Sequence, residues 1–219
     1  CYYDMKDYNA AAEAFKDFIA KYPGESLVVD AKFKIAEAKF MSGSLDEAKT
    51  LLEDFLKRYT VSKKLPDAYF LSGELDYAMK NYTAAADDYS KALEINPQAA
   101  WAPYAQYGKG WSNFKSGRYN EALMVFLAFR KDYSNSPLID SVIFGTAQSY
   151  YLLKDYANAV ISYDEIILKF QNSNYLDDAY LGKGDCLYGL EKYEGSAQAY
   201  KEAISKFPKS DLSGQFEYS

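Results

Sequence analysis

Residues 7–23 read DYNAAAEAFKDFIAKYP, with a polar start, small residues in the first turn, aromatic residues further on and a proline at the end. A similar stretch, NYTAAADDYSKALEINP, begins at Asn81, and another, DYANAVISYDEIILKFQ, begins at Asp155. If such returns are evenly spaced, the chain is a repeat array, and its function belongs on a surface rather than in a catalytic cleft.

The returns are evenly spaced, because matching residues recur every 37 positions (for example 82 − 45) along the 219-residue chain, without an insertion. An aromatic residue or Leu opens each copy, and then come a small residue, a bulky residue and a terminator. These columns are Tyr8, Leu45, Tyr82, Tyr119, Tyr156 and Tyr193; Ala11, Ala48, Ala85, Ala122, Ala159 and Ser196; Phe15, Leu52, Tyr89, Phe126, Tyr163 and Tyr200; and Pro23, Thr60, Pro97, Ser134, Gln171 and Pro208. Four columns in register over six copies indicate a repeat array.

The apolar spacing within each copy is that of a helix. Tyr82, Ala85 and Tyr89 stand at i, i+3 and i+7, on one helical face. The residue before each helix is Asp7, Ser44, Asn81, Arg118, Asp155 or Lys192, and four of these can cap a helix by accepting a bond from a free backbone N–H. The terminator column then ends the helix about four turns later.

A second helix is predicted before each of these. Its columns are aromatic or Leu, then small, then aromatic, at i, i+3 and i+7: Phe33, Phe70, Tyr107, Phe144 and Leu181; Ala36, Gly73, Gly110, Ala147 and Gly184; Phe40, Tyr77, Phe114, Tyr151 and Tyr188. Because a Gly inside a helix costs about 1 kcal/mol against Ala, its repeated use predicts the close approach of a neighbouring helix.

Each unit is therefore expected to hold two antiparallel helices of roughly 13 to 16 residues. One pair cannot bury its own apolar faces, whereas stacked pairs form a superhelix with a concave surface. The predicted fold is all-α, and residues 1–219 are predicted to form one array. Its expected divisions are 1–26 (a partial unit), 27–63, 64–100, 101–137, 138–174, 175–211 and 212–219 (the start of a further helix).

Composition excludes several classes of function. The formal net charge of −6 argues against a nucleic-acid partner, and no apolar run approaches the roughly 20 residues that span a bilayer. The chain has no His, which removes Ser-His-Asp and Cys-His catalysis and His-ligated metal. Two cysteines make neither a disulfide framework nor a zinc site, and Cys186 is expected to pack as a small apolar residue. We therefore expect no catalytic residue, metal or cofactor.

The spacings from Gly73 to Ala85, from Ala85 to Tyr89 and from Ala85 to Pro97 resemble those of the tetratricopeptide repeat family. The resemblance covers essentially the whole chain and implies a right-handed α-solenoid that binds proteins or peptides without catalysis. The repeat departs from the family's usual 34 residues by three, so the superhelix pitch cannot be carried over. The aromatic residue of the first helix in each pair also comes one residue later than in the family.

The longer unit, with YPGES, YSNSP and FPKSD between helix pairs, resembles repeats of bacterial envelope proteins and of large Bacteroidetes proteins. This resemblance implies a periplasmic or outer-membrane-associated location in a bacterium. Tyr3 falls in the column of Phe40, and LSGQFEYS begins a helix that stops, so we expect a fragment of a longer array. The rival interpretation is that Cys1 is the lipidated first residue of a mature lipoprotein.

In the tetratricopeptide family the first helix of each pair lines the concave groove. The resemblance therefore predicts a partner-binding groove formed by Phe33, Glu37, Phe40, Phe70, Glu74, Tyr77, Tyr104, Tyr107, Trp111, Phe114, Phe144, Gln148, Tyr151, Asp185 and Tyr188. The aromatic columns also suit packing between repeats. The middle column varies, as specificity residues or a solvated face would. Trp111 is the expected anchor, because Trp is enriched at interface hot spots; alternatively, it fills a gap left by Gly108 and Gly110.

Three of the five variable residues are acids, and Asp30, Asp67 and Asp178 add to them. The predicted surface is aromatic with a negative rim, which suits a peptide carrying Lys or Arg and apolar anchors. We therefore expect a non-catalytic protein–protein interaction scaffold. The alternative is a glycan-binding lipoprotein module, since Tyr and Trp faces stack on sugars. The sequence does not fix the oligomeric state.

Overall fold

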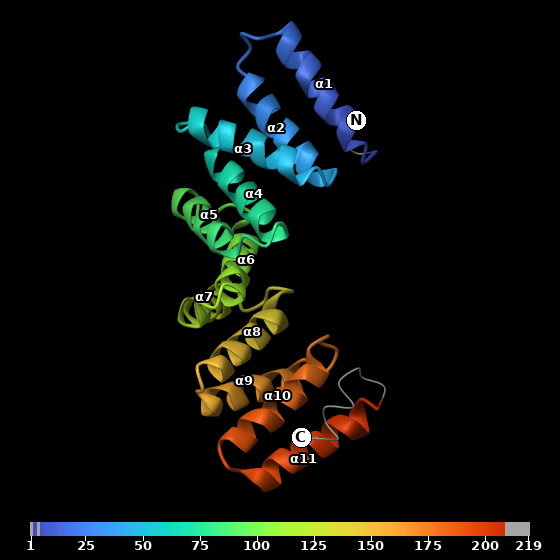
Figure 1. Cartoon of the computed structure of the whole chain (residues 1–219), viewed down its shortest axis with the longest axis vertical. Coiled ribbons are helices and arrows are strands. Elements are labelled where there is room, and N and C mark those ends of the chain that lie inside the picture. The colour runs from blue at the N-terminus through green and yellow to red at the C-terminus, as the bar shows by residue number, and fades with distance from the viewer. Residues whose placement is uncertain (1, 4, 209–219) are drawn as a thin grey trace. The chain divides into compact units, whose positions relative to one another are not determined.

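A computed structural model describes residues 2–3 and 5–208 (Figure 1). Eleven α-helices, each of 14 residues, and no strands occur in this described part of the chain. The helices are α1 (Tyr8–Lys21), α2 (Val28–Met41), α3 (Leu45–Arg58), α4 (Leu65–Ala78), α5 (Tyr82–Ile95), α6 (Ala102–Lys115), α7 (Tyr119–Asp132), α8 (Ile139–Leu152), α9 (Tyr156–Lys169), α10 (Leu176–Gly189) and α11 (Tyr193–Lys206). The predicted all-α class is confirmed. The expectations about Cys1 and about a helix over residues 212–219 lie outside the described residues.

The predicted helix starts are confirmed. Every odd-numbered helix begins at the opening column, and each ends two residues before the terminator column. The capping prediction is only half right: Asp7 and Asp155 accept bonds from the backbone N–H groups of Ala10 and Asn158. Ser44 and Asn81 make no such bond.

The amide of Asn81 points elsewhere. Its Nδ2 donates to Asp76 Oδ1 over 3.1 Å, and the ammonium of Lys49 binds the other oxygen of Asp76 at 2.6 Å. Asp76 is 1% exposed, and a buried carboxylate without donors is costly. The bond from Asn81 to Asp76 is therefore favoured over a cap at the start of α5.

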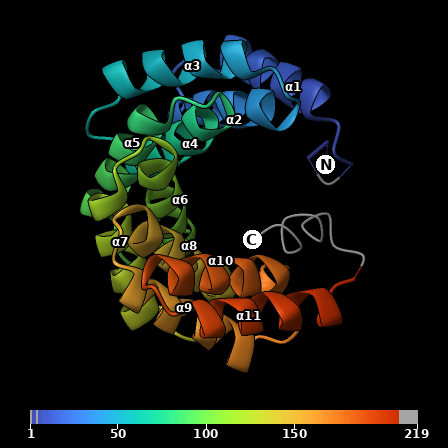
Figure 2. The ribbon, with the colours of Figure 1, turned by 60° about the horizontal axis from the view of Figure 1, so that its bottom comes forward.

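Contacts divide the chain into two compact units, residues 1–112 and 113–219, with the division inside α6. In the first unit, α1, α3 and α5 form one layer, and α2 and α4 form the other (Figure 2). In the second, α8 and α10 pack on α9 in the same way. Each unit is thus an α-solenoid of antiparallel helix pairs. One continuous array across residues 1–219 stays a prediction.

On α5, α7, α9 and α11, the aromatic residue of the bulky column packs against a glycine of a neighbouring helix. The ring of Tyr89 is 1% exposed, and a Cβ built on Gly73 of α4 would lie 2.7 Å from it. A Cβ on Gly108 of α6 would lie 2.6 Å from the same ring. Close approach is therefore the reason for the mid-helix glycines, as predicted, but the approaching group is an aromatic ring rather than a helix backbone.

The residue that lines this space varies with the size of the side chain that fills it. Gly145 and Gly182 stand one and two repeats after Gly108, and a Cβ on them would meet Phe126 at 2.7 Å and Tyr163 at 2.4 Å. Where the bulky column holds the smaller Leu52, the matching residue is Leu71, and both are buried. Ring and glycine, or leucine and leucine, are two ways to fill the same space at native density.

The turn between paired helices also repeats. One residue in each turn has a φ between 58° and 81°: Lys6, Gly43, Lys80, Gly117, Lys154 and Glu191. This left-handed backbone favours Gly, yet four copies carry a larger residue there. An aromatic pair at i and i+5 bridges the turn, as in Tyr77 with Tyr82, whose ring centroids are 5.4 Å apart.

Candidate functional site

The even-numbered helices share one face, made of four columns at i, i+4, i+7 and i+11, of which the second is buried on α4, α6, α8 and α10, as Leu71, Gly108, Gly145 and Gly182. On α2 these are Asp30, Lys34, Glu37 and Met41, which are exposed or half-buried. We call the matching residues of α2, α4, α6, α8 and α10 the even-helix face of each unit. The predicted middle column lies on this face. The first predicted aromatic column does not, because it points toward the odd-numbered helices.

The first aromatic column is engaged in packing. Phe33 is 5% exposed and packs on Phe55 with ring centroids 5.9 Å apart. Phe70 stacks on Trp101 at 5.1 Å and 7°. Phe144 stacks on Tyr175 at 4.7 Å and 17°. These predicted groove residues hold successive pairs together in each unit.

The acids of the middle column accept bonds from tyrosine hydroxyls. Tyr89 Oη donates to Glu74 Oε1 over 2.6 Å, and Tyr200 Oη donates to Asp185 Oδ1 over 2.6 Å. Tyr3 Oη donates to Glu37 over 3.0 Å. Burial first, and then the charge of Glu74, raise the pKa of Tyr89.

The third aromatic column packs across the turns. Tyr77 contacts Tyr82, and the same pairing joins Phe114 to Tyr119 at 5.5 Å, Tyr151 to Tyr156 at 5.8 Å and Tyr188 to Tyr193 at 5.4 Å. Phe40 is half-buried against the core around Leu52. Tyr188 nevertheless keeps 60% of its surface exposed. Gln148 is half-buried on the even-helix face of the second unit.

The helix α6 differs from the other helices of its layer. Where α2 and α4 carry Asp30 and Asp67, it carries Tyr104, which is 54% exposed. Trp111 takes the place of the middle-column acid and contacts Tyr107 edge-to-face at 6.3 Å. Tyr104 and Trp111 stand at i and i+7 on this helix, and Gly108 between them is buried against the Tyr89 ring. The Tyr89 ring occupies the space at Gly108.

Sequence reasoning missed the fourth column of the face. Met41 in the first unit and Leu152 in the second are both exposed, and each directly follows a predicted aromatic column. The signal was present, because i+4 after the middle column falls on the same helical stripe.

The acidic rim of the face has little to hold a metal. Burial, and then Asp177, raise the pKa of Asp178, which favours its neutral form. Within residues 2–3 and 5–208, no group of acids and cysteines is arranged to hold a metal ion. Nor is any described helix long and apolar enough to cross a membrane.

Comparisons with known proteins agree with this geometry. The profile of a family described as outer membrane lipoprotein (YfiO) matches residues 2–99, and tetratricopeptide repeat profiles match residues 107–177 and 178–210. Intraflagellar transport protein 70A of Danio rerio is 28% identical over 169 residues, which are 76% of this chain and 23% of that protein. The chain thus spans less than a quarter of that relative's length.

Solved structures share the fold at low identity. The apo form of RapI has a TM-score of 0.75 and 18% identity, over 95% of this chain and 62% of that one. YrrB, described as a TPR protein with an unusual peptide-binding site, has a TM-score of 0.75 and 16% identity, over 95% and 100% of the two chains.

Helix pairs at a constant period, with rings packed against small residues, define the class of α-solenoids. Within that class, this chain is a tetratricopeptide repeat protein.

Proposed function

We propose that the chain is a non-catalytic scaffold that binds a peptide segment of a partner protein on the even-helix face of its first unit. The observation that carries the proposal is the aromatic replacement on α6. Tyr104 and Trp111 stand where α2 and α4 carry acids, and Tyr104 exposes more than half of its surface. Exposed aromatic residues of this kind are the usual anchors of an interface.

The chemistry of the neighbouring helices suggests what the peptide carries. Asp30 and Asp67 lead to Tyr104 along one column, and Glu37 and Glu74 lead to Trp111 along another. The carboxylate of Glu74 accepts from the hydroxyl of Tyr89, and that of Glu37 accepts from Tyr3 and pairs with Lys34. An apolar side chain placed against Tyr104, flanked by Lys or Arg toward the acids, complements this surface.

The same proposal includes a place in a bacterial envelope assembly. Its support is the match of residues 2–99 to the outer membrane lipoprotein family, together with the 37-residue period. The peptide-binding description of YrrB supports peptide recognition by a related solenoid.

Tryptophan fluorescence tests the proposal, because Trp101 and Trp111 are the two tryptophans of the chain. In a Trp101→Phe variant, only Trp111 reports. We expect a library of basic, apolar-anchored peptides to yield members that shift its emission with saturation. Binding should fall at least tenfold in Tyr104→Ala, which loses about 1.5 kcal/mol or more of buried aromatic contact.

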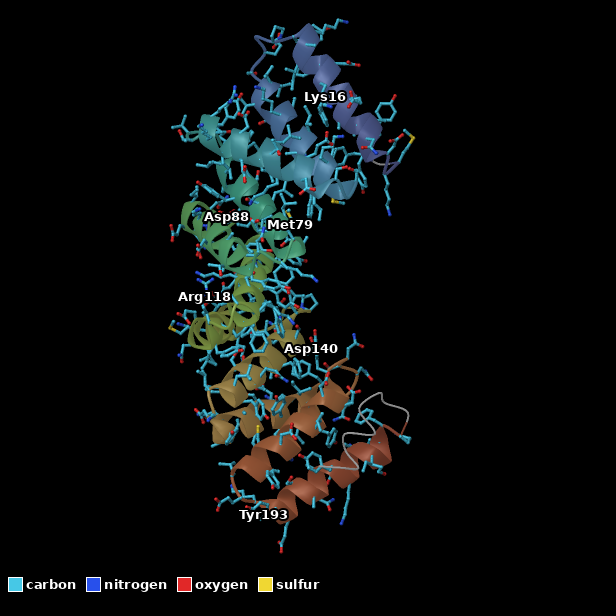
Figure 3. All side chains as sticks on the ribbon, in the orientation of Figure 1. Lys16, Met79, Asp88, Arg118, Asp140 and Tyr193 are labelled. Atoms are coloured by element: carbon cyan, nitrogen blue, oxygen red, sulfur yellow. The ribbon has the colours of Figure 1, made fainter. Side chains whose placement is uncertain are left out.

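Tyr193→Ala is the matched control, because Tyr193 is also an exposed tyrosine (58%) but lies on α11 of the other unit (Figure 3). It should bind as the parent does. A shift produced by oligosaccharides and by no peptide would replace the peptide proposal with glycan binding. Equal losses in Tyr104→Ala and Tyr193→Ala would remove α6 as the site.

A further inference from the structure

A pocket of about 210 Å³ lies between α1 and α3 of the first unit, and α2 also lines it. Its two residues from α2, Lys32 and Ile35, stand on the side of that helix opposite the even-helix face, which carries Lys34 and Glu37. The three helices that enclose the pocket are described over their whole length. This α1–α3 pocket is therefore separate from the site proposed on α6.

The inside of the α1–α3 pocket is apolar. Ile35 of α2 and Phe55 of α3 are only 5% and 2% exposed, and the half-buried Ile19 and Leu51 line the pocket from α1 and α3. A cavity of about 150 Å³ with such walls holds a benzene ring, whereas drug-sized ligands need about 300 Å³ or more. The pocket thus has room for one ring or one short branched chain.

A half-buried lysine adjoins the apolar lining. Lys32 Nζ donates to Tyr59 Oη over 2.9 Å. Among the described residues, no carboxylate pairs with Lys32. Because an ammonium group has three donors, the bond to Tyr59 leaves Lys32 able to bind an anion in the pocket.

The other charges around the mouth of the pocket pair within their own helices. Lys16 on α1 (Figure 3) binds Glu13 at 2.8 Å, and Asp54 on α3 binds Arg58 at 2.6 Å. Together with Lys32, these residues amount to three cations and two anions, which is an excess of one positive charge. A ligand with a single carboxylate therefore complements the mouth.

One repeat later, the same place holds polar groups that satisfy one another. Ser72 Oγ donates to Asp88 Oδ2 over 2.6 Å, and Lys91 Nζ binds Asp88 Oδ1 at 3.1 Å. The same ammonium group lies 5.1 Å from the centroid of the Tyr69 ring. Two apolar residues of the α1–α3 pocket stand where this later copy has its hydrogen-bonded pair. The residues 37 positions before Ser72, Asp88, Lys91 and Tyr69 are Ile35, Leu51, Asp54 and Lys32.

In the second unit, an ion pair joins two odd-numbered helices at matching positions. Arg130 of α7 pairs with Glu165 of α9, which is the counterpart of Asp54. In the α1–α3 pocket, by contrast, Lys16 and Asp54 each pair within one helix. The space between α1 and α3 is therefore left to a ligand rather than to charges of the chain.

We propose that the α1–α3 pocket binds a small organic acid that carries one aromatic ring or short branched chain and one carboxylate. The apolar group lies between Ile19 and Leu51, and the carboxylate accepts from Lys32. The inference rests on the lining and the charges of this pocket, and it does not depend on the site on α6.

The probe is 3-phenylpropionate, titrated into the isotope-labelled 219-residue chain. It should shift the amide resonances of Ile19, Ile35 and Leu51, with saturation at about 1 mM or below. The control ligand is 3-phenylpropionamide, which has the same ring and chain but no charge. It should bind at least about tenfold more weakly, because a charge-assisted hydrogen bond is stronger than a neutral one.

Two variants that each remove one lysine separate the pocket from general effects of charge. Lys32→Met keeps an unbranched side chain, and it should weaken binding of the acid at least about tenfold. Its affinities for the acid and the amide should then agree within about twofold. Lys57→Met removes the same charge from an exposed position of α3 outside the pocket, and it should bind the acid within about twofold of the parent. Circular dichroism checks that both variants are folded.

Three results would overturn the proposal. No saturable shift at about 10 mM acid would mean that the pocket takes no such ligand. Equal affinities of the parent chain for the acid and the amide would mean that Lys32 does not select a carboxylate. Equal weakening in Lys32→Met and Lys57→Met would trace the binding to the overall charge of the unit.

Discussion

Substituting Gly108 by Ala tests the close packing of rings against glycines. Gly to Ala within a helix ordinarily stabilises by about 1 kcal/mol. Here the added Cβ would lie 2.6 Å from Tyr89 Cζ and 2.8 Å from its Cε2 and Oη. The ring has little room to move away, since it also packs so close to Gly73 that a Cβ there would lie 2.7 Å from it, and its hydroxyl is bonded to Glu74.

Overpacking of this kind costs about 1 to 3 kcal/mol. The net change in the free energy of unfolding is thus a loss of up to about 2 kcal/mol, or no gain. Urea denaturation followed by circular dichroism measures it, with hydrogen exchange of α5 amides to localise the loss. Gly195→Ala is the control, because its Cβ would meet only Leu187 at 3.6 Å and should add up to about 1 kcal/mol.

A double-mutant cycle isolates the ring. In a Tyr89→Leu background the clash is absent, so Gly108→Ala should regain its stabilising sign. If Gly108→Ala stabilises the parent as much as Gly195→Ala does, the ring does not depend on the glycine, and this packing argument is refuted.

Lys80→Gly should stabilise the folded chain by about 1 kcal/mol, because Lys80 has a left-handed φ of 64° that favours Gly. Gly43→Ala should destabilise it by a similar amount in the same denaturation assay. Opposite signs would count against backbone strain in these turns. Asp178→Asn should raise Tm at pH 7, because burial, and then Asp177, raise the pKa of Asp178 in the folded state. The protonated acid therefore stabilises the fold fully below its ordinary pKa of 3.8, and this stability is lost as the pH rises through the folded pKa. The gain should vanish below pH 3.8, and a gain that persists there would exclude this cause. Burial, and then Asp185, raise the pKa of Cys186 to about 12, so peptide mapping after iodoacetamide at pH 8 should find Cys186 unmodified in the folded chain and modified in urea. Modification at equal rates in both states would contradict that burial.

The sequence predicted the helices well, because their signals are local. The opening column marked the start of all six odd-numbered helices, and the spacing of Tyr82, Ala85 and Tyr89 identified the buried stripe. Capping failed at Asn81, since the competing acceptor Asp76 belongs to the preceding helix and is buried by packing. A local pattern does not show which of two partners an amide meets.

The candidate site was harder to predict, because its residues differ only in what they touch. Glu74 looked like a free specificity residue, but the hydroxyl of Tyr89, 15 positions on, donates to it. That contact depends on how deeply the ring enters the space between Gly73 and Gly108. The pairing of a glycine with the ring of the preceding repeat was not predicted, because Lys34 and Leu71 occupy the column of Gly108 in earlier copies.

The central claim is that α6 presents a partner-binding surface through Tyr104 and Trp111. The most direct measurement places a photo-cross-linking amino acid at position 104 in the native cell, and at position 193 as the exposed control. The account predicts an adduct at 104 that maps to one segment with basic and apolar residues, and that disappears with Trp111→Ala. Adducts of equal yield at 104 and 193, or none at 104, would contradict it.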